Sequence, residues 1–181
     1  MPWPLPPPAP ARNLGPVTIL VNNAGITAYE PFTSISEASW DRMIGINLKG
    51  PFLVTKEIVP DMLDAGWGRI VNISSSSAQT GAPAMAHYAS SKGGVIALTR
   101  ALAVEYIEKG ITVNHVPPGF IDTPLVREGP VDVEAAAATM PDEACRSTGR
   151  HRLRGGAYLA SEEAAYVTGQ TLSVNGGRYL V

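Results

Sequence analysis

The chain has 181 residues, 45% of them hydrophobic, which is enough for one packed domain and too few for two of ordinary size. Its formal net charge is -2 and only 17% of its residues are charged, so the sequence offers no basic surface for nucleic acid or for an anionic membrane. The single cysteine, Cys145, cannot form an internal disulfide, and no apolar stretch is long enough to span a bilayer, so we expect a soluble protein of the cytoplasm.

Residues 1–16 are predicted to form a disordered arm, and residues 17–181 to form the folded domain. Residues 2–10 carry six prolines, which remove backbone donors and favour extended polyproline conformations. This arm therefore cannot be a central strand or a helix.

The first regular element is the apolar run Val17–Val21, which stops at the turn-forming residues Asn22–Gly25 and predicts a buried strand. A helix then begins near Ser34–Glu37, which has capping-box spacing, and runs to about Asp64. Its apolar residues recur near one face: Trp40, Met43, Ile44, Leu48, Val54 and Ile58. Asn47 interrupts that face, and Pro51 has no N–H to offer its carbonyl, so we expect a kink that frees this carbonyl.

A second buried strand is predicted at Arg69–Ile73, followed by a serine-rich turn and a second long helix over Met85–Lys109. The apolar stripe of this helix consists of Val95, Leu98, Leu102 and Tyr106. Gly93 and Gly94 each cost ~1 kcal/mol against alanine, which indicates a close helix contact or a functional neighbour.

Further strands are predicted at Ile111–Val116 and Thr171–Val174, each of which ends at glycine. The alternation of strands and long helices is typical of an α/β fold with a parallel sheet. Ligands bind outside the carboxyl ends of the strands in such sheets. We therefore expect the functional residues to converge on one edge.

Tyr88 and Lys92 lie four residues apart, which places both side chains on one face of the predicted helix. A tyrosine with its ordinary pKa of ~10 is a poor proton-transfer group at neutral pH. An ammonium ~5 Å away in an effective dielectric of ~20 favours the phenolate by ~3 kcal/mol, or about two pKa units. Tyr88 is then a candidate general acid and base. The alternative is a chance pairing on a solvated helix face.

Two further residues belong to the same candidate site. Ser75 follows the second strand, where its hydroxyl can reach an oxygen that Tyr88 protonates; the alternative is an ordinary serine loop. The freed carbonyl of Asn47 can hold a water that links Lys92 to solvent; the alternative is a kink with a satisfied core amide.

In order and spacing these motifs resemble the short-chain dehydrogenase/reductase family, over residues 14–141 and 157–177. The motifs are Asn22–Gly25, Asn47, Ser75, Tyr88-x-x-x-Lys92 and Pro118-Gly119 with Thr123. The resemblance implies a Rossmann-like, doubly wound parallel sheet. It also implies that Tyr88 exchanges a proton with the substrate oxygen, that Ser75 positions this oxygen, that Lys92 lowers the tyrosine pKa, and that Asn47 holds a relay water.

The same resemblance implies NAD or NADP as cofactor and hydride transfer to or from a carbonyl or alcohol carbon. The residues implied to lie beside the cofactor are Asn23, Ala24, Gly25, Tyr88, Lys92, Pro118, Gly119, Ile121 and Thr123. Within the family the chain is similar to 3-oxoacyl-carrier-protein reductases, so the substrate is a 3-oxoacyl thioester or a small ketone or alcohol. We expect a homo-oligomer built through the two long helices, and no metal. His87 is interpreted as an exposed helix histidine, with contact to substrate as the alternative.

The sequence departs from the family at two places. Members normally begin with a strand, a glycine-rich turn and a helix that holds the cofactor's pyrophosphate, and we expect this βαβ portion to be missing, which leaves the edge of the first strand open. Residues 142–156, DEACRSTGRHRLRGG, replace a family-like stretch. Suitable codons for them, read one nucleotide later, encode TKRAGRPEDIACGA, so we hypothesise a local frameshift.

Two rival interpretations of the function stay open at this point. The chain can be an inactive fragment or pseudoenzyme that retains only an interaction surface. The proline-rich arm can also indicate a peptide-binding protein, which rests on composition alone.

Overall fold

The computed structural model describes residues 15–119, 121, 123–127, 150–175 and 179. Three strands, β1 (Ile19–Asn22), β2 (Gly68–Ile73) and β3 (Ile111–Val116), pair in parallel in this order. The predicted α/β class with a parallel sheet is confirmed. Most of the proline-rich arm and most of residues 142–156 lie outside the described residues, so these two predictions stay predictions.

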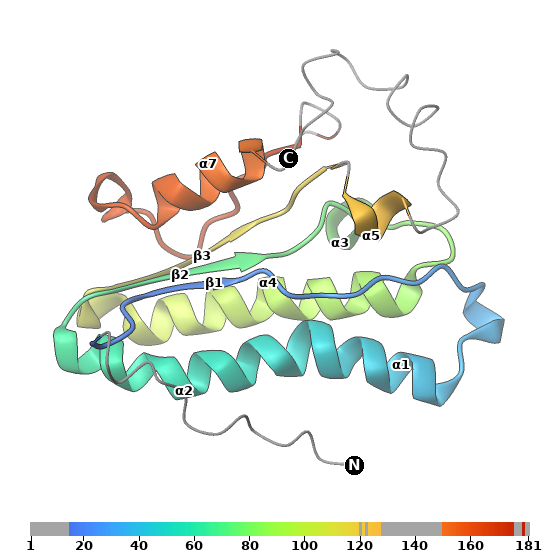
Figure 1. The fold of residues 1–181 in the computed structure, drawn as a ribbon, viewed down its shortest axis with the longest axis horizontal. Helices are drawn as coiled ribbons and strands as arrows, with labels where there is room; N and C mark the ends of the chain where they lie inside the picture. Colours follow the sequence, from blue (N-terminus) through green and yellow to red (C-terminus); the bar gives the residue numbers. More distant parts are fainter. Residues whose placement is uncertain (1–14, 120, 122, 128–149, 176–178, 180–181) are drawn as a thin grey trace.

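Helices cover both faces of the sheet (Figure 1). On one face lie α2 (Gly50–Ala65) and α4 (Ala86–Tyr106), and their apolar side chains pack with those of β2 and β3. On the other face, α7 (Arg150–Leu159) packs on β2 and β3. The two apolar clusters consist of Val59, Met62, Ile70, Ala103, Ile111 and Val113 on the first face and of Val71, Ile73, Val116 and Leu159 on the second. The sheet is thus the middle layer of three.

The first helical region is divided into three parts. It consists of α1 (Glu37–Ile44), a π-helical segment, η3 (Gly45–Lys49), and α2. A short 3-10 turn, η2 (Phe32–Ser34), precedes it. The side chain of Ser36 caps α1 by accepting a 3.1 Å hydrogen bond from the Ser39 N–H, so the predicted capping box at Ser34–Glu37 is wrong by two residues.

The π-helical segment changes which face of α2 is buried. Gly50 N–H bonds to the carbonyl of Gly45, five residues back, which inserts one extra residue into the helix. One residue corresponds to a rotation of about 100°. The buried residues of α2 are accordingly Pro51, Thr55, Val59 and Met62. The predicted stripe through Val54 is wrong, since this side chain is 46% exposed.

Helix α4 and the 3-10 turn η4 (Ile107–Lys109) together fill the predicted second long helix. A Cβ atom placed on Gly94 would lie 2.5 Å from the Leu48 side chain. Gly94 therefore permits a close contact between α4 and the π-helical segment, as predicted, whereas a Cβ atom on Gly93 would meet nothing within 4 Å, so the prediction is wrong for Gly93. The buried face of α4 is partly polar, because Thr99 lies on it between the apolar residues Val95 and Ala103.

Strand β1 is less buried than predicted. Ile19 is 46% exposed and Val21 48% exposed, whereas Leu20 packs against the core beside α2 and α4. β1 is an edge strand of the described sheet, and Ile19 and Val21 alternate with Leu20, so they point to the opposite face. The prediction of a fully buried strand is therefore wrong for the face of β1 that carries Ile19 and Val21.

The predicted fourth strand, Thr171–Val174, forms two isolated parallel bridges, His115 with Thr171 and Pro118 with Val174. It follows α7 and the 3-10 turn η6 (Glu162–Ala164) and runs beside β3 toward the same edge. Among the described helices, none has both the length and the apolar character that a membrane span requires.

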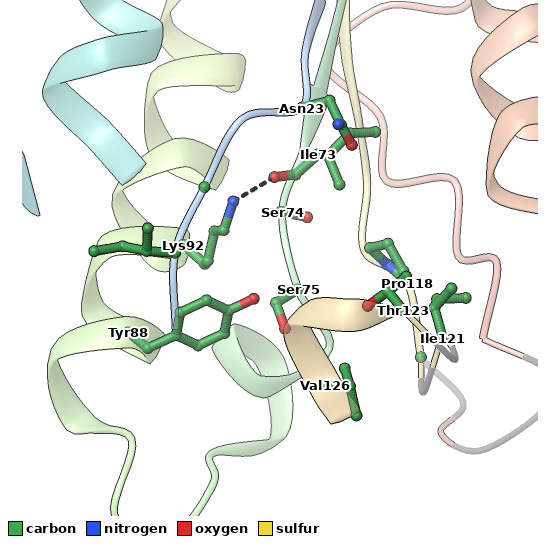
Figure 2. A pocket seen from close by; sticks show the side chains of 13 residues that line it. Asn23, Ile73, Ser74, Ser75, Tyr88, Lys92, Pro118, Ile121, Thr123 and Val126 are labelled. Carbon is green, nitrogen blue, oxygen red and sulfur yellow. Dashed lines mark hydrogen bonds between the residues drawn. The ribbon is translucent and has the colours of Figure 1, made fainter. Parts of the chain in front are cut away.

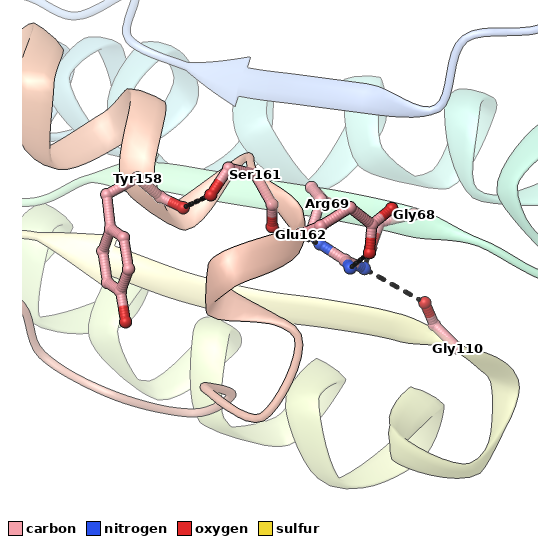
Figure 3. A network of polar contacts seen from close by, with 6 residues as sticks. All are labelled: Gly68, Arg69, Gly110, Tyr158, Ser161 and Glu162. Atoms are coloured by element: carbon pink, nitrogen blue, oxygen red, sulfur yellow. Dashed lines mark hydrogen bonds and ion pairs between the residues drawn. The ribbon is translucent and has the colours of Figure 1, made fainter.

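A buried arginine connects β2, β3 and the segment after α7 at the amino ends of the strands (Figure 3). The guanidinium of Arg69, on β2, donates to the carbonyls of Gly110 (3.3 Å) and Ser161 (3.3 Å) and lies 3.4 Å from the carboxylate of Glu162. It also stacks over the Trp67 ring, 4.4 Å from the ring centroid. This network holds the amino ends of β2 and β3 to the segment after α7, far from the carboxyl edge.

Candidate active site

A pocket opens at the carboxyl edge of the sheet, where segments following all three strands meet (Figure 2). Its lining residues are Asn23, Gly25, Ile26, Ile73, Ser74, Ser75, Tyr88, Lys92, Pro118, Gly119, Ile121, Thr123 and Val126. The cavity has a volume of about 120 Å³.

Tyr88 and Ser75 face each other across this pocket, as Figure 2 shows. Burial of the phenol raises the pKa of Tyr88, while the neighbouring Ser75 hydroxyl acts in the lowering direction and nearby Tyr29 acts in the raising direction. The predicted lowering of the Tyr88 pKa is wrong in its net direction. The physical reason is desolvation, which disfavours the charged phenolate.

Lys92 lies one turn further along α4 and is buried. Its ammonium donates a 2.9 Å hydrogen bond to the carbonyl of Ile73, the last residue of β2 (Figure 2). A Cβ atom on Gly25 would stand 3.4 Å from Lys92 Nζ and 3.1 Å from Asn47 Oδ1. The backbone after β1 thus packs closely against the ammonium.

The side chain of Asn47 holds that backbone in place. Its Oδ1 accepts a 2.8 Å bond from the Ile26 N–H, and its Nδ2 donates a 2.9 Å bond to the Ile26 carbonyl. Nδ2 also lies 3.1 Å from Ser91 Oγ on α4. Asn47 is fully buried behind the pocket, so its amide acts as a clamp between the π-helical segment, α4 and the loop after β1.

A polar network in the core continues from β1. Asn22 Nδ2 donates to Asn72 Oδ1 (2.8 Å) and to Thr55 Oγ1 (3.1 Å), and Asn72 Nδ2 donates to Thr99 Oγ1 (2.8 Å). These bonds connect β1 and β2 with α2 and α4. They fix the point at which β1 ends and the pocket loop begins.

His87 is fully buried, and its interpretation as an exposed histidine is wrong. Its Nε2 lies 3.4 Å from Glu30 Oε1, and the same carboxylate oxygen accepts a 2.5 Å bond from Ser39 Oγ. The Glu30 N–H donates to the carbonyl of Ala84, which has a φ of 57° in the turn before α4. These contacts fasten the loop after β1 to the first turn of α4, which carries Tyr88.

The pocket lining also includes Pro118 and Gly119, and the segment after Thr171 supports these two residues. Gly119 N–H donates to the Val174 carbonyl (3.3 Å), and Ser76 N–H donates to the Pro118 carbonyl (3.2 Å). A Cβ atom on Gly119 would lie 2.9 Å from the carbonyl oxygen of Asn175. Only glycine therefore allows this close approach of two backbones.

Among the predicted site residues, Asn47 and Ala24 lie outside this lining and the others lie in it: Asn23, Gly25, Ser75, Tyr88, Lys92, Pro118, Gly119, Ile121 and Thr123. Ile26, Ile73, Ser74 and Val126 also line the pocket and were not predicted. Ile26 and Ser74 adjoin predicted site residues and Ile73 ends a predicted strand, whereas no such signal indicates Val126.

A comparison with protein families finds that the model described as short chain dehydrogenase matches residues 9–133. The nodulation protein G of Azospirillum brasilense is 46% identical over 168 residues, which cover 91% of this chain and 67% of that protein. An acetoacetyl-CoA reductase of Rhizobium meliloti (strain 1021) is 42% identical, with 92% and 70% covered. A 3-oxoacyl-[acyl-carrier-protein] reductase of Thermotoga maritima is 39% identical, with 92% and 68% covered.

Proposed function

Because this chain belongs to the short-chain dehydrogenase family, we propose that it is an NAD(P)-dependent oxidoreductase that acts on the 3-oxo group of an acyl thioester. The observation that carries the proposal is that Ser75, Tyr88 and Lys92 line one pocket at the carboxyl edge of a parallel sheet. Two of the relatives are named as reductases of 3-oxoacyl thioesters, and none of the relatives described above favours the inactive alternative.

The proposed catalytic residues divide the proton chemistry between them. The Tyr88 hydroxyl holds the proton that passes to the substrate's carbonyl oxygen, and its raised pKa keeps it protonated before the reaction. Ser75, which lies across the pocket from Tyr88, orients the same oxygen. The buried ammonium of Lys92 favours the phenolate as it forms, since an opposite charge nearby stabilises it.

Asn47 has two proposed roles. Its side chain clamps Ile26 and so keeps the loop after β1 against Lys92. Its main-chain carbonyl, at the π-helical segment, is the proposed site of a water that links Lys92 to solvent. The two roles use different atoms and can be separated by substitution.

The residues present fit the nicotinamide and its ribose. Asn23, Ala24, Gly25, Tyr88 and Lys92 are proposed to hold the ribose, and Pro118, Gly119, Ile121 and Thr123 to lie along the nicotinamide ring. The fit rests on a small cavity lined by the Lys92 ammonium, by the hydroxyls of Tyr88 and Ser75, and by closely packed backbone at Gly25 and Gly119. When bound, the cofactor supplies or accepts the hydride.

A homo-oligomer built through the two long helices is also proposed. Exposed apolar side chains lie on α2 and α4: Phe52 (45%), Val54 (46%), Leu63 (40%) and Val104 (78%). These exposed apolar side chains are the reason for placing the proposed contact on the two helices. We further propose that the chain acts in the cytoplasm, because its single cysteine needs no oxidising compartment.

Titration of the 181-residue chain with NADH and with NADPH, followed by nicotinamide fluorescence, tests the proposal. We expect saturable binding that Lys92→Ala weakens and that Lys109→Ala, on the exposed turn after α4, leaves unchanged. A folded chain that binds neither nucleotide would overturn the proposed function for this chain and favour the inactive alternative.

A further inference from the structure

A second buried histidine lies beneath the pocket. His115, on β3, is fully buried, and both of its ring nitrogens have hydroxyl partners. Nδ1 lies 2.7 Å from Ser74 Oγ, and Nε2 lies 2.7 Å from Thr171 Oγ1. The imidazole therefore bridges the end of β2 and the C-terminal segment across β3.

Both partners of His115 belong to walls of the pocket or to their support. Ser74 lines the pocket and directly precedes Ser75. Thr171 starts the segment whose Val174 carbonyl accepts the N–H of Gly119, which also lines the pocket. Ser74 Oγ is thus bonded to His115 below the pocket, whereas Ser75 Oγ accepts a 3.2 Å hydrogen bond from the Ser77 N–H within the turn.

The charge state of His115 suits two hydroxyl partners. Burial and the positive charge of Arg100, which faces it from α4, lower its pKa to about 4. Ser74 and Thr171 do not titrate, so the imidazole is neutral at pH 7. A neutral imidazole has one N–H donor and one acceptor nitrogen, and each hydroxyl can donate or accept. Both hydroxyls are therefore satisfied in either tautomer.

We infer that His115 is a positioning residue that fixes the Ser74 hydroxyl and, through it, the turn at the end of β2 that carries Ser75. The inference rests on the proposed function only in treating Ser75 as part of the reacting centre. An apolar residue at position 115 would leave two hydroxyls without this partner and would release the Ser74–Ser77 turn from the C-terminal segment.

The order of that turn can be measured without cofactor or turnover. Ser76 N–H donates to the Pro118 carbonyl (3.2 Å), and Ser77 N–H donates to Ser75 Oγ (3.2 Å). Their amide hydrogen exchange reports on the turn. The Arg69 N–H, which donates to Thr18 at the other end of the sheet (2.9 Å), is the internal reference. A merely structural role of His115 would change all three exchange rates by the same factor.

Two substitutions separate the two ring nitrogens. The amide of His115→Asn reaches the place of Nδ1 and keeps the bond to Ser74, whereas the amide of His115→Gln reaches the place of Nε2 and keeps the bond to Thr171. We expect His115→Gln to speed exchange at Ser76 and Ser77 about tenfold relative to Arg69, the effect of one lost hydrogen bond. His115→Asn should leave this ratio unchanged.

A measurement on the unsubstituted imidazole covers the case in which these variants do not fold. In ¹⁵N spectra of the histidine side chains, Ser74→Ala should shift the Nδ1 signal of His115 and Thr171→Val its Nε2 signal. Equal exchange changes at all three amides in both variants, or imidazole signals unmoved by Ser74→Ala, would overturn the inference. Since no cofactor is present, failure here is distinct from failure of the proposed function.

Discussion

Replacing Asn47 by alanine should destabilise the chain and disturb the cofactor pocket. The change removes the partners of the Ile26 N–H and carbonyl, which bond to Asn47 at 2.8 and 2.9 Å. Each buried group left without a partner costs ~1–3 kcal/mol, so the expected loss of unfolding free energy is about 3 kcal/mol. With a urea dependence of ~2 kcal/mol per molar, the unfolding midpoint falls by about 1.5 M.

Asn114→Ala is the matched control. Asn114 is also fully buried, and its amide likewise bonds one carbonyl, of Val167 (2.7 Å), and one N–H, of Gln170 (3.0 Å), away from the pocket. Both variants should lose similar stability, but only Asn47→Ala should weaken the binding of NADH or NADPH. The main-chain carbonyl of Asn47 is kept, so the effect belongs to the side-chain clamp. A change in stability under ~0.5 kcal/mol, or equal weakening by both variants, would refute this reasoning.

Three further predictions follow from particular residues. The pKa of His115 is about 4 in the folded chain, against an ordinary value of 6.5, so the unfolded chain binds an extra proton below pH 6.5. The free energy of unfolding should therefore fall by about 3 kcal/mol between pH 6.5 and pH 4. Urea unfolding over this pH range should show the loss, and an equal loss in His115→Asn would contradict it. Gly110→Ala should cost about 2–5 kcal/mol, because Gly110 has a φ of 75° and a Cβ atom would collide with the Gly66 carbonyl. Gly66→Ala, with a φ of 61° and open space, should cost only about 1 kcal/mol in the same thermal unfolding assay, and equal costs would contradict the collision. Val104→Lys should lower the mass measured by light scattering if α4 forms the oligomer contact, and an unchanged oligomer would exclude this position from the interface.

The strands and long helices could be predicted because local sequence specifies them. The apolar runs of β2 and β3 are bounded by glycine, serine or proline, and the structure places these strands within one residue of their predicted limits. The buried face of α2 could not be predicted in this way. It depends on the π-helical segment at Asn47, whose side chain bonds to Ile26, 21 residues earlier, and helical periodicity carries no information on such a contact.

The sequence predicts which residues make up the candidate site better than it predicts the directions of their pKa shifts. Fixed spacing and helix geometry bring Tyr88 and Lys92 to one face, and the end of β2 adds Ser75. The direction of the Tyr88 pKa was mispredicted, because spacing says nothing about desolvation. His87 is buried with Glu30, a residue of the loop after β1, 3.4 Å away, and only the tertiary fold brings these two residues together.

Reduction of acetoacetyl-CoA by NADPH or NADH, with the 181-residue chain and its Tyr88→Phe variant, tests the central claim most directly. We predict turnover by the unsubstituted chain and a loss of about a hundredfold to ten-thousandfold in rate for Tyr88→Phe, the usual range for general acid–base catalysis. Tyr106→Phe, at the far end of the same helix, should keep the rate. A folded Tyr88→Phe variant with unchanged turnover, or a folded unsubstituted chain without turnover, would contradict the account.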